Sequence, residues 1–147
     1  MSTDQNKSTA RRISEEVWNK GNLKALDEIF APGAPTHDPN TPIAPGPEGF
    51  RQVVSLYRSA FPDLRFTIEQ EIAEGDYVVQ RLTATGTQRG DLPGIPATGK
   101  RVTITGIAIN RVKDGKIAEG WTVFDQLGLL QQLGVVPTSE QMAAARH

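Results

Sequence analysis

Residues 101–124, RVTITGIAINRVKDGKIAEGWTVF, place two β-rich runs on either side of a tight turn. Val, Ile and Thr dominate residues 101–112, and residues 116–124 return with β-branched and aromatic side chains, so both runs favour extended strands. The Lys-Asp-Gly at 113–115 contains an Asp-Gly pair, which is a strong signal for a β-hairpin turn. The stretch therefore predicts the last two antiparallel strands of the fold.

Two further strands are predicted upstream, at residues 66–72 and 77–87. Apolar and polar side chains alternate in the first of them, which indicates one buried face and one solvated face that carries Glu69 and Glu71. The Glu-Gly-Asp at 74–76 supplies the turn of a second hairpin. Together the four strands predict a mostly antiparallel sheet.

Helical periodicity predicts three helices before the strands and one after them. Their start and stop residues are Ser8 or Thr9 and Gly21, then Asn22, then Pro47 and Pro62, and finally Asp125 and Gly134. Helices segregated from hairpin-connected strands indicate an α+β fold, in which a curved sheet wraps around the N-terminal helices and encloses a pocket. We expect one domain over residues 9–136, with flexible ends at 1–8 and 137–147.

Composition excludes several classes of function. The formal net charge is -1, and acidic and basic residues are interleaved, so no nucleic-acid partner is expected. The chain has no cysteine, which rules out disulfides, thiolate nucleophiles and thiolate metal sites. No secretory signal and no apolar run of roughly 20 residues is visible, so we expect a cytoplasmic protein without a membrane partner. Neither metal-ligand spacing nor a phosphate-binding loop is found, and no cofactor is expected.

Two residues are candidates for catalysis. His37, in a Thr-His-Asp-Pro-Asn stretch, could be a general base at the mouth of the pocket with Asp38 orienting its ring, or a loop histidine that hydrogen-bonds the backbone. Arg81 could polarise a carbonyl or bind a carboxylate if it shares the concave face with Thr83 and Thr85. The opposite strand phase places Arg81 on the convex face, in solvent or in a subunit contact.

Other side chains are expected to line the pocket, although aromatic residues at helical or strand spacing are more often core. The predicted lining residues are Trp18, Phe30, Tyr57, Phe61, Ala108, Asn110, Thr122 and Phe124. Asp125 could also reach the pocket, but its position favours an N-cap of the closing helix.

Four separated stretches carry a resemblance to a known family. They are GPEGF at 46–50, AFPDL at 60–64, GIPATGK at 94–100 and DQLGLLQQLG at 125–134. In this order they resemble the SnoaL-like polyketide cyclase (ester cyclase) family over nearly the whole chain. The resemblance implies the cone-shaped, cystatin-like α+β fold shared with nuclear transport factor two.

The resemblance also implies a chemistry. Described members close a polyketide ring by an intramolecular aldol reaction without metal or cofactor, using an aspartate on the last strand and a histidine on the strand before it. Those positions fall at Thr122 and Ala108 here, and neither side chain exchanges protons at neutral pH. A homodimer through the convex face is implied as well, and the outward alternation of Thr103, Thr105, Ile107 and Ile109 is consistent with it.

Two hypotheses follow from these observations. The first is an enzyme that cyclises, isomerises, hydrates or dehydrates a polyketide-like or other apolar carbonyl compound, with His37 transferring the proton and Arg81 assisting. The second is a non-catalytic or accessory protein that binds a small molecule in the same cavity, which the residues at Ala108 and Thr122 favour. A protein-interaction domain would need an exposed apolar patch beyond the dimer contact, and the sequence shows none.

Overall fold

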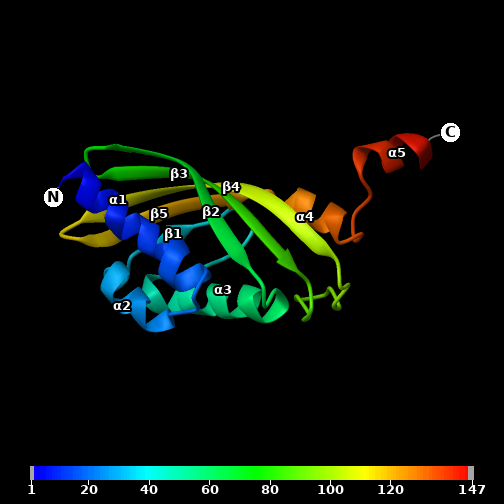
Figure 1. The fold of residues 1–147 in the computed structure, drawn as a ribbon, viewed down its shortest axis with the longest axis horizontal. Coiled ribbons are helices and arrows are strands. Elements are labelled where there is room, and N and C mark those ends of the chain that lie inside the picture. The colour runs from blue at the N-terminus through cyan, green and yellow to red at the C-terminus, as the bar shows by residue number, and fades with distance from the viewer. Residues whose placement is uncertain (1, 146–147) are drawn as a thin grey trace.

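Four long strands follow one another in hairpin order and form a curved sheet with a short fifth strand at its edge (Figure 1). The computed structural model describes residues 2–145. The strand order is β1-β5-β4-β3-β2, and every neighbouring pair is antiparallel except β1 with β5. The strands are β1 (Thr36–His37), β2 (Arg65–Glu74), β3 (Tyr77–Thr87), β4 (Arg101–Lys113) and β5 (Lys116–Phe124).

Helices pack against this sheet or extend away from it. They are α1 (Thr3–Arg12), α2 (Leu26–Ile29), α3 (Gly46–Ala60), α4 (Gln126–Gln132) and α5 (Ser139–Ala145). Figure 1 shows α1, α2 and α3 on the same side of the sheet, whereas α5 projects away from the rest. The predicted α+β class, with helices packed on one side of a mostly antiparallel sheet, is confirmed. Within residues 2–145, no helix has the length and apolar character needed to cross a membrane.

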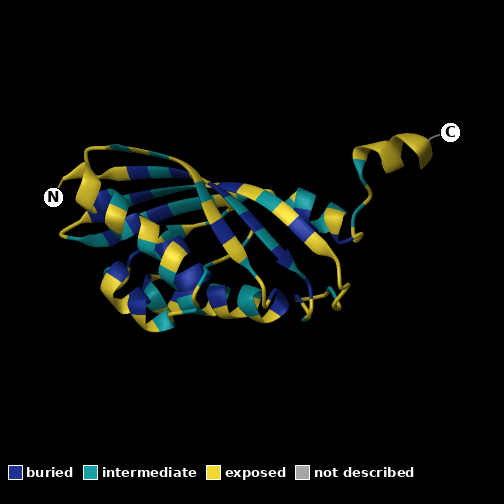
Figure 2. Ribbon diagram, in the orientation of Figure 1, coloured by how far each residue is buried: buried dark blue, intermediate teal, exposed yellow. Residues whose placement is uncertain are grey.

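The core lies between the inner face of the sheet and helices α1 to α3. Side chains from both layers meet there without any exposure to solvent, among them Val17, Leu26, Val54, Val78 and Ile117. On α3, buried positions alternate with exposed ones, while α5 has no buried residue (Figure 2). The helix layer is therefore amphipathic and closes one side of the sheet.

The β4–β5 hairpin matches the sequence prediction. Asp114 and Gly115 have φ angles of 52° and 77°, the left-handed conformations that a two-residue type I′ turn requires. Lys113 then pairs with Lys116, and the register shifts by one residue between Val112 and Arg111, which leaves Ala118 without a partner. The two strands end within one residue of their predicted limits.

A β-bulge in β2 reverses the face on which its second half points. The register with β3 shifts between Ile68 and Gln70, which leaves Glu69 without a partner residue. After this extra residue the alternation is out of phase, so Glu71 turns inward and Ile72 turns outward with 57% exposure. The Glu71 side chain is only 9% exposed. The prediction that Glu71 lies on a solvated face is therefore wrong.

The short strand β1 was predicted as part of a proline-rich loop. Thr36 pairs with Gly120 and His37 with Trp121, in parallel with β5. The Gly120 N–H donates to the Pro35 carbonyl at 2.9 Å, which closes this edge of the sheet. A strand of two residues carries no alternation pattern, which is why sequence periodicity misses it.

The first helix starts earlier than predicted. Ser2 is its N-cap: the Ser2 hydroxyl accepts from the Gln5 N–H, and the Gln5 side chain accepts from the Ser2 N–H, at 3.1 and 2.9 Å. The expected start at Ser8 or Thr9 is wrong because this capping box lies upstream. The helix then passes into a π-helical turn, Ile13–Trp18. Flexibility of the two ends stays a prediction, and Met1 and residues 146–147 lie outside the described residues.

Replacing Asp125 with Ala is expected to cost about 1 kcal/mol in the free energy of unfolding. The Asp125 Oδ1 accepts from the Gly128 N–H at 2.9 Å and caps α4, so the loss leaves that donor without its partner. Urea unfolding followed by circular dichroism measures the change. Asp125→Asn is the matched control, because asparagine caps a helix about as well; equal losses for both variants would contradict the capping role.

Candidate active site

A cavity opens between the inner face of the sheet and the helices that cover it. The cavity has a volume of about 110 Å³, and the wider hollow around it, which includes open solvent, has about 1140 Å³. The side chains assigned to a pocket from the sequence lie in its wall: Trp18, Phe30, Tyr57, Phe61, Ala108, Asn110, Thr122 and Phe124. The interior of the fold can therefore enclose a small molecule.

Aromatic rings in the wall pack against one another. Trp18 and Phe66 stack with centroids 4.5 Å apart and planes 8° from parallel. Phe66 meets Phe124 edge to face at 5.6 Å, and Trp18 meets Tyr57 in the same way at 6.5 Å. These rings are thus part of the core and part of the cavity wall at once, and their mutual contacts keep the wall rigid.

A row of inward-facing residues crosses three strands of the sheet. Gln80 on β3 pairs with Ala108 on β4, and Ala108 pairs with Thr122 on β5. Next to this row, the Asn110 side chain lies over Gly120, where an added Cβ would come within 2.8 Å of the Asn110 Oδ1. Amide and hydroxyl groups therefore provide the polar contacts on this part of the sheet.

Asp38 and Tyr57 are the lining residues whose side chains can titrate. Burial raises the pKa of the Tyr57 phenol, the negative charge of Asp38 raises it further, and hydrogen bonding to Thr41 partly offsets both effects. The phenol therefore keeps its proton at neutral pH and can donate a hydrogen bond inside the cavity. Within the described residues, no group of three or more His, Cys, Asp or Glu side chains could hold a metal ion.

Strand β1 brings Asp38 to the cavity. Thr36 lies beside Gly120 and lines the cavity, and Asp38, two residues later, lines it as well. Strand β1 ends at His37, and Asp38 and Thr122 both belong to the cavity wall. The Asp38 Oδ1 accepts from the Asn40 N–H at 2.8 Å, which fixes the carboxylate in an Asx turn.

His37 points to the other side of the sheet. Its Nε2 lies 2.7 Å from the Glu119 Oε2, and its ring stacks on Trp121 with centroids 5.5 Å apart. The side chain is 52% exposed and is not part of the cavity wall. Glu119, and not Asp38, is the carboxylate that orients the ring. His37 instead lines a shallower depression that shares Asp38 and Thr122 with the cavity.

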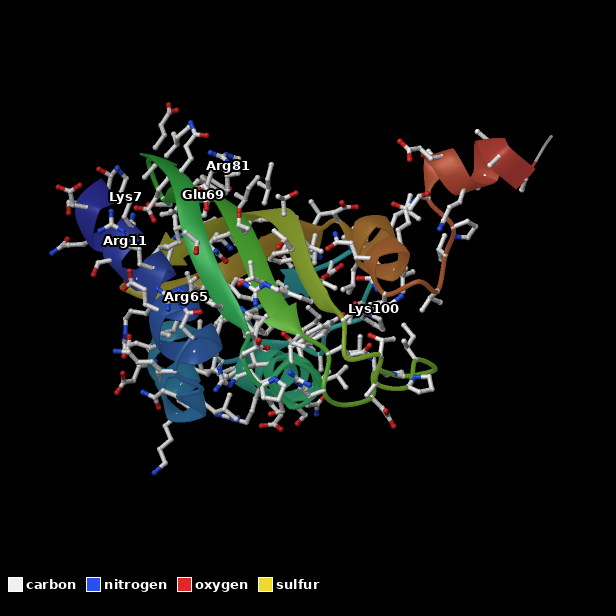
Figure 3. The ribbon with its side chains drawn as sticks, turned by 45° about the vertical axis from the view of Figure 1, so that its right-hand side comes forward. Lys7, Arg11, Arg65, Glu69, Arg81 and Lys100 are labelled. Atoms are coloured by element: carbon white, nitrogen blue, oxygen red, sulfur yellow. The ribbon has the colours of Figure 1, made fainter. Side chains whose placement is uncertain are left out.

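Arg81 also lies outside the cavity. It is exposed on β3, one residue out of phase with the inward-facing Gln80, and its Nε donates to the Gln70 side chain at 3.3 Å. In Figure 3, Arg81 and Glu69 project from the side of the sheet that faces away from the helices. The convex-face alternative for Arg81 is the one that the structure shows. Strands β4 and β5 separate it from His37, so the two cannot act on one bond.

Comparison with known proteins settles the family. The model of the SnoaL-like polyketide cyclases matches residues 8–133. The chain belongs to the SnoaL-like polyketide cyclase family. Aklanonic acid methyl ester cyclase DnrD of Streptomyces peucetius is 37% identical to this SnoaL-like chain over 125 residues, which cover 81% of the chain and 84% of the relative.

Further relatives agree with this SnoaL-like assignment. Nogalonic acid methyl ester cyclase of Streptomyces nogalater is 34% identical over 122 residues, covering 80% of the chain and 90% of that protein. Among solved structures, TsrD from Streptomyces laurentii superposes with a TM-score of 0.82 at 32% identity, covering 92% of the chain and 99% of TsrD. The fold is the cone shared by SnoaL-like proteins and nuclear transport factor two, as predicted.

Sequence reasoning missed three polar residues of this SnoaL-like site. Asp38 was considered only as a partner of His37, although its spacing of two from Thr36 could have indicated that both face the cavity. Nothing in the sequence indicated that Gln80 faces the cavity, because either side of β3 could have faced inward. Glu71 was placed on the wrong face, since nothing in the local sequence marks the bulge.

The charge of Asp38 should be measurable through Tyr57. Replacing Asp38 with Asn removes a negative charge that disfavours the phenolate, so the pKa of Tyr57 is expected to fall towards its ordinary value. Burial persists in the variant and keeps part of the elevation. Ultraviolet absorbance of the phenolate during a pH titration measures it, in a Tyr77→Phe background because the chain has two tyrosines. An unchanged pKa would show that Asp38 does not act on the phenol.

Proposed function

We propose that this SnoaL-like chain is an enzyme that acts on an apolar, polyketide-like carbonyl compound by general acid–base catalysis without a cofactor. The observation that supports this most directly is the position of Asp38, a carboxylate in the wall of a mostly apolar cavity. Tyr57, whose elevated pKa keeps it protonated, provides a hydrogen-bond donor in the same space. A base and a donor are what proton abstraction beside a carbonyl requires.

The proposal accounts for Thr122 and Ala108. By resemblance, these two positions correspond to the aspartate and histidine of described family members, and neither can transfer a proton here. Asp38 and Thr122 both line the cavity, so the Asp38 carboxylate can reach part of the same space. We infer that the general base has moved from β5 to the end of β1, and that Thr122 leaves room for it.

The reaction that this arrangement supports is an intramolecular aldol cyclisation. Asp38 takes the proton from a carbon next to a carbonyl, and a hydrogen bond from the Tyr57 hydroxyl stabilises the enolate oxygen. The enolate carbon then attacks a second carbonyl of the same molecule and forms the C–C bond. The new alkoxide takes up the proton that Asp38 had removed. Product and substrate have the same atoms, so no co-reactant is needed.

The names of the relatives suggest a substrate class. Two of them are methyl ester cyclases, one of aklanonic acid and one of nogalonic acid. We propose that this chain also takes an aromatic polyketide that carries a methyl ester and a side chain able to form an enolate. The aromatic wall around Trp18 and Phe66 is suited to a flat, apolar ring system.

Incubation with aklanonic acid methyl ester tests the proposal. Chromatography with mass detection should reveal a product of unchanged mass and altered retention. Asp38→Asn should lower the rate by a factor of about 100 or more, because it removes the general base. Tyr57→Phe should lower it less, since it removes one hydrogen bond. Arg81→Ala, which alters the convex face, is the control and should leave the rate unchanged.

A variant whose cavity is filled by a larger side chain tests whether ligand binding and turnover both take place there. Thr122→Trp should fill the space beside Asp38 and abolish both the thermal stabilisation by ligand and any turnover. Stabilisation of the wild type without turnover would favour the non-catalytic binding protein. Turnover that survives in Asp38→Asn would contradict the assignment of the base.

The convex face supports a second proposal, a homodimer. Large apolar side chains lie exposed there on neighbouring strands, including Ile72, Tyr77, Ile107 and Val123. Exposed apolar side chains gathered on one face are typical of a contact with another protein. We propose that a second copy of the chain covers it, in agreement with the expectation from the family.

Adding a charge to this face should dissociate the dimer. Val123→Glu places a carboxylate on a side chain of this apolar surface that is 46% exposed. Analytical ultracentrifugation should then detect a monomer where the wild type sediments as a dimer. Leu56→Glu adds the same charge to an exposed position on α3 and should leave the dimer intact. A wild type that is monomeric at all concentrations would contradict the proposal.

A further inference from the structure

The inner face of the sheet holds one long polar side chain almost out of reach of bulk solvent. Gln80 is 2% exposed, and it lines the cavity. Its pairing partners are Glu71 on β2 and Ala108 on β4, with Thr122 next in the row. Burying an amide among apolar groups is costly unless its hydrogen bonds are satisfied, so the partners of Gln80 are informative.

An ion pair fixes this amide from one side. The Gln80 Nε2 donates to the Glu71 Oε2 at 2.8 Å. The other Glu71 oxygen, Oε1, accepts from the Arg11 guanidinium at 2.7 and 2.8 Å. Figure 3 shows Arg11 on α1, at the side of the molecule away from α5. The bulge in β2 is what turns Glu71 inward to make these contacts.

These contacts determine which end of the amide meets the cavity. A carboxylate only accepts hydrogen bonds, so it selects the amide nitrogen and directs the Gln80 Oε1 away from β2. In residues 2–145, no side-chain hydrogen bond uses this oxygen, and the wholly buried polar atom that lacks a partner is the Asn6 Oδ1. The Gln80 Oε1 is therefore not wholly buried, and it belongs to a side chain that lines the cavity.

We propose that the Gln80 Oε1 accepts a hydrogen bond from a hydroxyl group of the ligand, and that Glu71 and Arg11 are the positioning residues that hold it. The negative carboxylate on the amide nitrogen polarises the amide and makes its oxygen a stronger acceptor. The ligand class is accordingly an aromatic compound with a phenolic or enolic hydroxyl. This inference rests on the proposed function in that the ligand occupies this cavity.

The test uses two probes that differ by one hydroxyl, 2-naphthol and naphthalene. The wild type is expected to bind 2-naphthol about tenfold more tightly, which is the effect of one buried hydrogen bond. Gln80→Met has a similar volume without the amide and should lose this preference while still binding naphthalene. Calorimetric titration of each protein with each probe gives the ratio of the two dissociation constants.

Variants of the positioning residues sharpen the test. Glu71→Gln can donate as well as accept, so it no longer fixes the amide, and the preference should fall without a matching loss of naphthalene affinity. Arg11→Lys keeps the charge beside Glu71 and should retain more of the preference than Arg11→Ala. Thr83→Val, on the opposite face of β3, is the control and should leave the ratio unchanged.

The outcomes separate this inference from the function on which it rests. A purely structural role for Gln80 would change the stability of Gln80→Met but not the ratio of affinities, and an unchanged ratio overturns the inference. Equal affinity of the wild type for both probes overturns it too, while cavity binding stands. If the wild type binds neither probe, the proposed function fails and this inference fails with it.

Discussion

Two residue pairs between β1 and β5 determine the chemistry of the cavity mouth. They hold Thr36 beside Gly120 and His37 beside Trp121. Because side chains alternate along a strand, this pairing determines which of them point into the interior. The carboxylate of Asp38 reaches the cavity, whereas the His37 imidazole is directed to the convex face. A shift of this short pairing by one residue would exchange the two groups. The edge of the sheet is thus as important to the site as its centre.

Charge is distributed unevenly between the cavity and its surroundings. Arginines pair with carboxylates at the periphery, as Arg12 does with Glu16 and Glu28, and as Arg111 does with Glu119. Among residues 2–145, the side chains of the cavity wall include the Asp38 carboxylate and no basic group. In such a space a charge is poorly screened, which is why it acts on the phenol of Tyr57. The base that we propose, Asp38, thus lies in a mostly apolar wall with neutral donors and acceptors around it.

Much of the fold could be predicted from the sequence because its long elements have clear periods. The β4–β5 hairpin followed from its Asp-Gly turn, and α3 from its apolar stripe between two prolines. The site was harder. The sequence of β3 does not show which of its alternating side chains face the cavity, so it allows Arg81 on either face of the sheet. Strand β1 is too short to show a period, and its partner is distant in the sequence. Pairing across the sheet, which only the tertiary structure provides, resolved both.

Because of the bulge, the number of residues in β2 determines which of its side chains face inward. Glu71 faces inward and Ile72 outward because one residue, Glu69, stands unpaired in the strand. An insertion or deletion of a single codon near this point would restore the ordinary alternation and exchange the two side chains between the faces. One such event would remove the carboxylate behind Gln80 and remove an isoleucine from the convex surface. One inserted or deleted residue would therefore change the ligand contacts in the cavity and the contact surface on the convex face at the same time. Substitutions at single positions would change only one of the two.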